Sequence, residues 1–374
     1  MEEVYQGKHF ETGESVSIHV ENGLIVAIEP CSSQPDHFIA PGLIDNQVNG
    51  YAGVGFTQPG LSVQDIRKVI GRMQNIGVTT FLPTLITASQ ELLLENLAVL
   101  NEACSDPVIT NSIPGIHLEG PYISSEDGFR GAHNLEWVRL PDLSEFEELY
   151  AASGERICHI TLAPELDGAL DLISLCQSKN ITVGLAHHNA SAEQIHAAVE
   201  AGAGLAVHLG NGIANILPRH RNPIWPQLSN ENLTISIIAD GFHLTADEIK
   251  TFFRVKGADK TILTSDCTDL AGLPPGNYSW DGKEVVLGPE GVIRYPAQNV
   301  LAGAASPLIR DIEIMMQTVN CSLSEAINMA TRNPARFHGL NDRGELAIGM
   351  RAHLILFSLT DNKLQLKQTV MNDN

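Results

Sequence analysis

The 374-residue sequence lacks the segments that direct a chain into a membrane or out of the cell. No stretch approaches the roughly 18 consecutive apolar residues that a membrane-spanning helix needs. The first residues, Met1-Glu2-Glu3, are acidic, whereas a signal peptide begins with basic residues and continues into an apolar run. The six cysteines are scattered and form no C-x-x-C pair, which favours free thiols over a disulfide framework. These absences predict a soluble, cytoplasmic protein without a membrane partner.

Positive charge is also scarce. The chain has 23 Lys and Arg against 44 Asp and Glu, and its net charge is −21. A nucleic-acid partner is excluded by this balance, because phosphate backbones are bound by clustered Lys and Arg. A small anionic substrate is not excluded, since one or two local arginines are enough to bind a phosphate group.

The middle of the chain contains eight short apolar or β-branched runs, which alternate with amphipathic helical stretches. The predicted strands are Gly42–Asn49, Gly77–Thr84, Ser112–Glu119, Ile157–Ala163, Ile181–His187, Gly204–His208, Leu233–Asp240 and Lys260–Asp266. The predicted helices are 62–75, 89–104, 167–179, 191–201 and 245–256, and the Pro-rich stretch 211–230 is expected to be short or irregular. Strands that alternate with helices indicate a parallel sheet, and eight such units predict an α/β fold, a (β/α)8 TIM-type barrel.

The two ends of the chain follow a different pattern. Residues 15–28 and 353–366 alternate polar and apolar side chains, which is typical of half-buried strands. We expect both ends to join in one small β-sandwich domain, with residues 1–38 and 345–374 in that domain and 39–344 in the barrel. The Gly/Pro-rich segment 272–299 is expected to form a β-hairpin that overhangs the site.

Polar residues end most of the predicted barrel strands. Barrel enzymes carry their chemistry at the carboxyl ends of the strands, so these residues are the candidate site. A single His or carboxylate at such a position is usually a packing residue or a helix cap, but Glu119, His187, His208 and Asp266 come from four strands and would converge if the barrel closes. One carboxylate and two imidazoles suit a Zn2+ ion with an open position for water, and a further carboxylate suits proton transfer.

Longer strings resemble a known family. Pro41-Gly42-Leu43-Ile44-Asp45, Asn333-Pro334-Ala335 and Ala352-His353-Leu354-Ile355 are similar to the opening strand and tail of the amidohydrolase superfamily. The interior strings resemble the N-acetylglucosamine-6-phosphate deacetylase family: His117-Leu118-Glu119-Gly120-Pro121, Gly131-Ala132-His133, Ala186-His187-x-Asn189-Ala190, His208-Leu209-x-Asn211, Ala239-Asp240-Gly241-x-His243 and Leu301-Ala302-Gly303. The resemblance covers nearly the whole chain and implies removal of the N-acetyl group from an amino-sugar phosphate.

The resemblance also implies a role for each matching residue. Glu119, His187 and His208 would hold the metal, Asp266 would act as general base and then general acid, and His133 would polarise the acetyl carbonyl. The substrate contacts implied are Ala132, Asn211, Gly212, His243, Leu301, Ala302 and Gly303, with Arg219 or Arg221 reaching the phosphate across a homodimer. His188 is a neighbouring candidate ligand, but the family motif places the ligand two residues before the Asn.

One metal ion is expected. Many superfamily members carry H-x-H at the end of the first strand, where a second metal binds, whereas this chain has Gln47-Val48-Asn49. Amides are poorer ligands for a transition metal than imidazole, so the second-metal position is predicted to be lost at Gln47 and Asn49. The predicted cofactor is one divalent ion, Zn2+ with Fe2+ as the alternative.

Departures from the family pattern leave the exact sugar and the need for phosphate open. Gly210 stands where the family usually has Phe or Tyr, which predicts a wider pocket there, and Ser265-Asp266-Cys267 replaces T-D-A but keeps the Asp. Two alternative functions remain: an amidohydrolase for another N-acyl or cyclic amide substrate, and a non-catalytic barrel that serves as a binding module.

Overall fold

A computed structural model describes residues 3–280, 283–296 and 300–371. Its centre is an eight-stranded sheet in which every neighbouring pair is parallel. In spatial order the strands are β5 (Leu43–Val48), β8 (Val78–Ile86), β9 (Ile116–Glu119), β10 (Ile157–Leu162), β11 (Thr182–Leu185), β12 (Ala203–Ala206), β13 (Thr234–Ile237) and β14 (Thr261–Leu263). The first and last strands meet where Val48 bridges Cys267, so the predicted barrel is confirmed.

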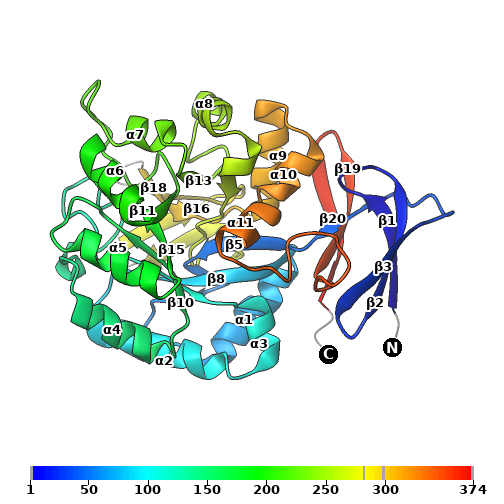
Figure 1. Ribbon diagram of the computed structural model, residues 1–374, viewed down its shortest axis with the longest axis horizontal. Helices are drawn as coiled ribbons and strands as arrows, with labels where there is room; N and C mark the ends of the chain where they lie inside the picture. The colour runs from blue at the N-terminus through cyan, green and yellow to red at the C-terminus, as the bar shows by residue number, and fades with distance from the viewer. Residues whose placement is uncertain (1–2, 281–282, 297–299, 372–374) are drawn as a thin grey trace.

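Helices connect the strands and pack around the barrel (Figure 1). The longer ones are α1 (Val63–Gln74), α2 (Gln90–Ala103), α4 (Leu143–Ala152), α5 (Ala169–Ser178), α6 (Ala192–Ala201), α8 (Ala246–Lys256) and α9 (Leu308–Val319). The shorter ones are α3 (Pro107–Ser112), α7 (Ile224–Ser229), α10 (Leu323–Asn328), α11 (Arg332–Phe337) and the 3-10 turns η1 (Leu135–Trp137) and η2 (Ala258–Lys260). Capping boxes begin α1, α6 and α8 at Ser62, Ser191 and Thr245, because each hydroxyl accepts a bond from the third backbone N–H of its helix.

Several predicted strand boundaries were wrong. The third strand begins at Ile116 rather than Ser112, because Ser112 ends helix α3. Three other strands were predicted to run through His187, His208 and Asp266, but they end earlier, at Leu185, Ala206 and Leu263. These three site residues have φ angles of 51°, 34° and 48°, a left-handed backbone that cannot continue a strand.

The two ends of the chain share one six-stranded sheet beside the barrel, which confirms the predicted small β domain (Figure 1). The order is β20 (Lys363–Val370), β19 (Leu354–Thr360), β4 (Phe38–Pro41), β1 (Glu3–His9), β2 (Ser15–Glu21) and β3 (Leu24–Pro30). Buried side chains from both ends, among them Ile18, Ile39 and Leu354, form its own apolar core. Strand β4 is separated from the first barrel strand by Gly42 alone, so the two units are joined through almost continuous β structure.

The segment after β14 forms more than the predicted hairpin. It contains four antiparallel strands in chain order, β15 (Gly276–Trp280), β16 (Lys283–Leu287), β17 (Val292–Tyr295) and β18 (Val300–Ala304), which we call the insertion sheet. A small hairpin of β6 (Gly50–Tyr51) and β7 (Val54–Gly55) follows β5. All six cysteines are free, as predicted. Within the described ranges, no helix is both long and apolar enough to cross a membrane.

Candidate active site

A cavity of about 630 Å³ opens at the carboxyl ends of the barrel strands. Its lining includes the predicted Glu119, His133, His187, His208 and Asp266, and also Asn49, Ala132, Asn211, Gly212, His243, Leu301 and Gly303. The insertion sheet overhangs this cavity, as predicted, because Ser279 from β15 and two residues of β18 line it. The side chain of Ala302 lies outside the described residues.

Glu119 lies at the centre of the polar cluster. It is the last residue of β9 and is only 2% exposed. Its Oε1 atom lies 2.9 Å from His208 Nε2 and 3.5 Å from His187 Nε2. Burial opposes ionisation of this carboxyl group, but the two imidazoles outweigh burial and hold its pKa well below the usual range. Glu119 is therefore a carboxylate, the form that binds a metal ion.

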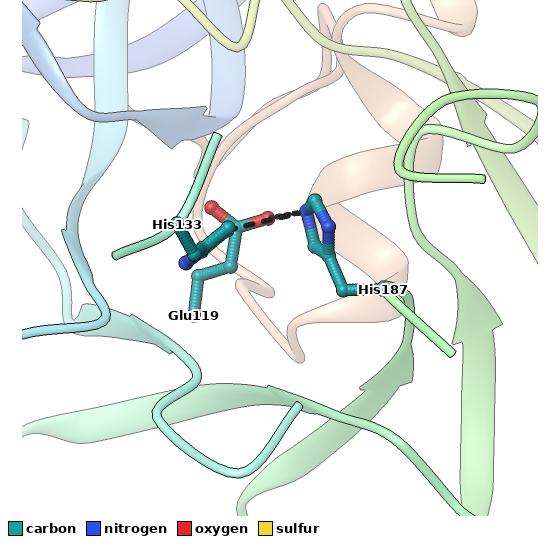
Figure 2. Close-up of side chains that lie close together, drawn as sticks. All are labelled: Glu119, His133 and His187. Carbon is teal, nitrogen blue, oxygen red and sulfur yellow. Dashed lines mark hydrogen bonds and ion pairs between the residues drawn. The ribbon is translucent and has the colours of Figure 1, made fainter. Parts of the chain in front are cut away.

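The ring of His187 is held in one orientation. Its Nδ1 atom lies 3.0 Å from the carbonyl oxygen of Phe129, and because a carbonyl only accepts, Nδ1 carries the proton. In the neutral ring Nε2 is then a lone pair that faces Glu119 (Figure 2). Gly131 and Gly212 leave room for the ring, since a Cβ at either position would lie within 2.8 Å of it. Gly212, predicted as a substrate contact, therefore also shapes the metal site.

His133 approaches from the loop after β9. Its Nε2 atom lies 3.3 Å from His187 Nε2, and its Nδ1 atom lies 2.8 Å from the hydroxyl of Thr87. Because His187 Nε2 is the acceptor of the pair, His133 Nε2 carries the proton and Thr87 donates to Nδ1. Burial lowers the pKa of His133 to about 3, so its ring is neutral. A neutral imidazole with its N–H directed into the cavity can donate to a substrate carbonyl.

The cluster fits a divalent metal ion. Glu119, His133 and His187 offer ligand atoms that all lie within 4.8 Å of one another, and His208 contacts the same carboxylate. Glu119 Oε1 and His187 Nε2 lie 3.5 Å apart, so an oxygen and a nitrogen that can both bind a cation face each other across this point. Carboxylate oxygen and imidazole nitrogen are the ligands of catalytic zinc sites. The structure thus brings together the three predicted ligands and adds His133 beside them.

The amides of Gln47 and Asn49, where the sequence predicted a lost second-metal position, lie beside the two carboxylates of the cluster. Gln47 Nε2 donates to Glu119 at 2.8 Å and to Asp266 Oδ1 at 2.9 Å, and Asn49 Nδ2 donates to the same Asp266 oxygen at 2.7 Å. Amide protons thus face the two carboxylates from this side.

Asp266 follows β14 and faces the cluster across the barrel mouth. Burial, and then the negative charge of Glu119, raise its pKa to about 6. For His208, burial opposes protonation, but the bond to Glu119 and its charge prevail and raise the pKa. A carboxylate whose pKa lies near neutrality can both take and return a proton at physiological pH.

Polar groups for a substrate lie on the side of β12 and β13. Asn211 lines the cavity, and its Nδ2 atom is buried without a partner among the described residues. His243 is oriented by Asp240, whose Oδ2 atom lies 2.8 Å from His243 Nδ1. A buried amide donor without a partner and an oriented imidazole suit a polyhydroxylated or phosphorylated ligand.

Some candidate residues lie elsewhere. His188 contacts Gln227 and does not line the main cavity, so it is the poorer ligand candidate of the two histidines. Arg219 and Arg221 are exposed in the segment before α7 and do not line the cavity of their own chain. Gly210 lines a smaller neighbouring pocket and not this cavity, and a Cβ there would lie 2.8 Å from Leu244, so the wider pocket stays a prediction.

Sequence reasoning missed the residues that orient the site. Thr87 fixes His133, and Asp240 fixes His243. Asp240 stood within a quoted motif, so its place three residues before His243 was a usable signal. Thr87 had no such signal, since it is separated from His133 by 46 positions. Trp137 was also missed; it lines the cavity from η1.

The chain is similar to known proteins in both its sequence and its fold. The model of the amidohydrolase family matches residues 38–374. The N-acetylgalactosamine-6-phosphate deacetylase of Escherichia coli O157:H7 is 30% identical over 90% of this chain and 89% of its own, and the N-acetylglucosamine-6-phosphate deacetylase of Vibrio furnissii is 31% identical over 95% and 89%. The crystal structure of N-acetylglucosamine-6-phosphate deacetylase from Pasteurella multocida superimposes with a TM-score of 0.88 at 27% identity and covers 99% of this chain and 98% of that chain.

Proposed function

We propose that this chain, which belongs to the amidohydrolase family and within it to the N-acetylglucosamine-6-phosphate deacetylases, is a metal-dependent hydrolase that removes the N-acetyl group of an amino-sugar phosphate. The products are the amino-sugar phosphate and acetate. One observation carries the proposal: Glu119 at the end of β9, with His187 and His208 just beyond β11 and β12, converge on one point beside Asp266 and His133.

Glu119, His187 and His208 are the residues that would hold the metal ion. A divalent ion bound there lowers the pKa of water and polarises a carbonyl group. Zinc is proposed, since the donor set is one carboxylate and two imidazoles, and one ion is expected because Gln47 and Asn49 direct amide protons at the second position.

The protein's own side chains supply the proton transfers. Asp266, ionised above its pKa of about 6, accepts a proton from the attacking water as a C–O bond forms on the carbonyl carbon. His133 donates a hydrogen bond from Nε2–H to the carbonyl oxygen and keeps its proton throughout. The C–N bond then breaks as Asp266 gives its proton to the leaving amine nitrogen, and the acid product is released as acetate.

The amino-sugar side of the substrate is assigned to Asn211 and His243, with Ala132, Leu301 and Gly303 as cavity walls. We further propose a homodimer in which Arg219 or Arg221 of one subunit reaches the phosphate bound by the other. Their exposure on the surface of a single chain supports this arrangement. A cytoplasmic location is proposed from the sequence and is supported by six free cysteines.

A substrate screen tests the function. The zinc-loaded protein is assayed for acetate release from N-acetylglucosamine, N-acetylgalactosamine and the 6-phosphate of each. We expect turnover of at least one 6-phosphate, with kcat/KM roughly 10- to 100-fold above that of the unphosphorylated sugar, the gain expected from charge-assisted bonds to phosphate. Turnover only of N-acetyl amino acids or cyclic amides would favour the alternative amidohydrolase. No turnover and no bound metal would favour a binding module.

A further inference from the structure

The cavity extends on the side opposite the proposed sugar contacts. Asn211 and His243 follow β12 and β13, the sixth and seventh strands of the ring, whereas β8 is the second strand and lies across from them. Around β8 the cavity is walled by one group of apolar side chains, which we call the acyl lobe: Pro59, Ile86, Ala88, Leu92 and Trp137. The proposed sugar contacts do not account for this part of the cavity.

The walls of the acyl lobe are uncharged. Its polar neighbours in the cavity lining are Thr57, Gln58, Thr87 and Asn134, all neutral. Asp269 lines the cavity as well and lies at the edge of this region, beside Gly55. Ile86, Leu92 and Trp137 remain only partly buried, so each presents apolar surface that a ligand can cover. Such a lobe favours an apolar neutral group and disfavours an anionic one.

Buried polar contacts hold the lobe in shape. Arg139 Nη1 donates to the carbonyl oxygens of both Ala88, at 3.0 Å, and Trp137, at 2.7 Å, and so ties η1 to the end of β8. The guanidinium is itself fixed by Glu145, which also accepts a bond from Tyr122. On the other wall, Thr57 Oγ1 accepts from the backbone N–H of Ile86 at 2.9 Å. The lobe is therefore preformed, and a chain that enters it meets a built surface.

We propose that the acyl lobe receives the acyl group of the substrate, and that the enzyme hydrolyses N-acyl amino-sugar phosphates with neutral acyl chains longer than acetyl. The inference rests on the proposed function. An amide has its nitrogen substituent on one side and its acyl substituent on the other, so a sugar at Asn211 and His243 directs the acyl carbon chain toward β8. The reaction consumes one water: the C–N bond breaks, a C–O bond forms on the acyl carbon, and the nitrogen gains a proton.

A series of N-acetyl, N-butyryl and N-hexanoyl glucosamine 6-phosphates tests the inference. Each methylene buried in the lobe can raise kcat/KM by up to about fourfold, so the N-butyryl substrate should be hydrolysed at least as efficiently as the N-acetyl one. An N-succinyl substrate should fall roughly tenfold or more below N-butyryl, because its carboxylate enters an apolar lobe near Asp269. If the N-acetyl substrate is hydrolysed efficiently but kcat/KM for the N-butyryl substrate is lower by roughly 100-fold or more, the role of the acyl lobe is wrong while the proposed function stands. Failure of every substrate would overturn the proposed function with it.

Variants with a larger side chain in the acyl lobe can be compared with a control variant on the same helix. Leu92→Trp should lower the ratio of N-butyryl to N-acetyl kcat/KM by roughly tenfold or more, because the larger side chain occupies the space of the added methylenes. Glu95→Trp is the control; Glu95 lies on the same helix, is exposed and does not line the cavity, so its ratio should equal that of the wild type. Ile86→Phe is the second lobe variant if Leu92→Trp does not fold. An unchanged ratio in a folded lobe variant would contradict the inference.

Discussion

Three residues of the candidate site have a left-handed backbone. His187, His208 and Asp266 each have a positive φ angle directly after a barrel strand. A left-handed conformation costs a residue with a Cβ of the order of 1 kcal/mol or more, and it persists only where the surroundings hold it. Here it ends each strand and turns the side chain toward the barrel mouth. The neighbouring bonds that hold it include the one from His208 N to Ser236 Oγ, at 2.8 Å.

If Asp266 is the general base, its substitution should lower turnover without lowering the metal content of the protein. Asp266→Asn keeps the size of the side chain and removes the base, so kcat should fall by roughly 100-fold or more while the bound metal remains. Elemental analysis and acetate release on the same preparation measure both. Near-normal turnover in the metal-loaded variant would show that another group moves the proton.

A substitution of Thr87 should lower kcat to a smaller extent, because Thr87 acts on the reaction only by orienting His133. Thr87→Val preserves shape but removes the hydroxyl that donates to His133 Nδ1, so the imidazole is free to place its proton on the wrong nitrogen. We expect kcat to fall about tenfold with KM little changed, since the lost interaction acts on the transition state. Steady-state kinetics resolve the two constants. Thr87→Ser, which restores the hydroxyl, should recover most of kcat, and equal losses in both variants would rule out this role.

Among single residues, the sequence predicted the members of the polar cluster better than the residues that orient them. Glu119, His187, His208 and Asp266 were identifiable because polar side chains at the ends of buried apolar runs are unusual and because several lie in motifs. Thr87 and Gln47 act through contacts with residues at least 46 positions away, and no local pattern predicts such contacts. The left-handed φ angles were equally hidden, because only a few per cent of non-glycine residues adopt that conformation, even though Asp and His do so more often than most.

A buried carboxyl group, that of Asp45, lies where the first and last strands of the barrel meet. Asp45 in β5 is fully buried, and its Oδ1 atom accepts bonds from Thr264 Oγ1 at 3.1 Å and Ser265 N at 3.2 Å, just beyond β14. Burial raises the pKa of Asp45 to about 6 from a reference value of 3.8, although the hydrogen bonds oppose this shift. The stability of the contact that closes the barrel therefore depends on whether Asp45 is protonated.

The linkage predicts the sign of a pH effect on stability. Because the folded pKa exceeds the unfolded one, the protonated group stabilises the fold below about pH 4, and this contribution is lost as the pH rises through 6. Asp45→Asn does not titrate. Between pH 4.5 and 7.5, the free energy of unfolding of the wild type should therefore fall by about 2 kcal/mol relative to the variant. Urea unfolding of both metal-free proteins measures the difference, and a gap that is independent of pH would contradict it.

Elements were predictable where local chemistry sets them. Ser62, Ser191 and Thr245 mark true helix starts, because a capping hydroxyl satisfies backbone N–H groups within its own turn. Helix α3 was missed because its residues, Val108-Ile109-Thr110, are β-branched, while the signals that favour a helix are its Asp106 cap and Pro107. The insertion sheet was reduced to a hairpin because its strands are short and separated by Gly and Pro residues.

At the scale of the molecule, the terminal β domain is attached to the barrel at both ends of the chain. Strand β4 leads directly into β5, and Glu313 of α9 accepts bonds from Lys363 Nζ at 2.8 Å and Leu364 N at 2.7 Å in β20. The architecture was predictable because eight repeats of strand and helix permit few other closed arrangements. The pairing of both ends in one sheet was expected from their matching alternation, whereas its register depends on contacts that no periodicity specifies.

We propose that one metal ion, held among these strand ends, makes the protein an amide hydrolase. The most direct test is a titration of metal-free protein with Zn2+ while acetate release from N-acetylglucosamine 6-phosphate is measured. We expect no activity without metal and a linear rise in activity that reaches its plateau at one equivalent of Zn2+ per chain. Full activity in metal-free protein, or a plateau that requires two equivalents, would contradict it.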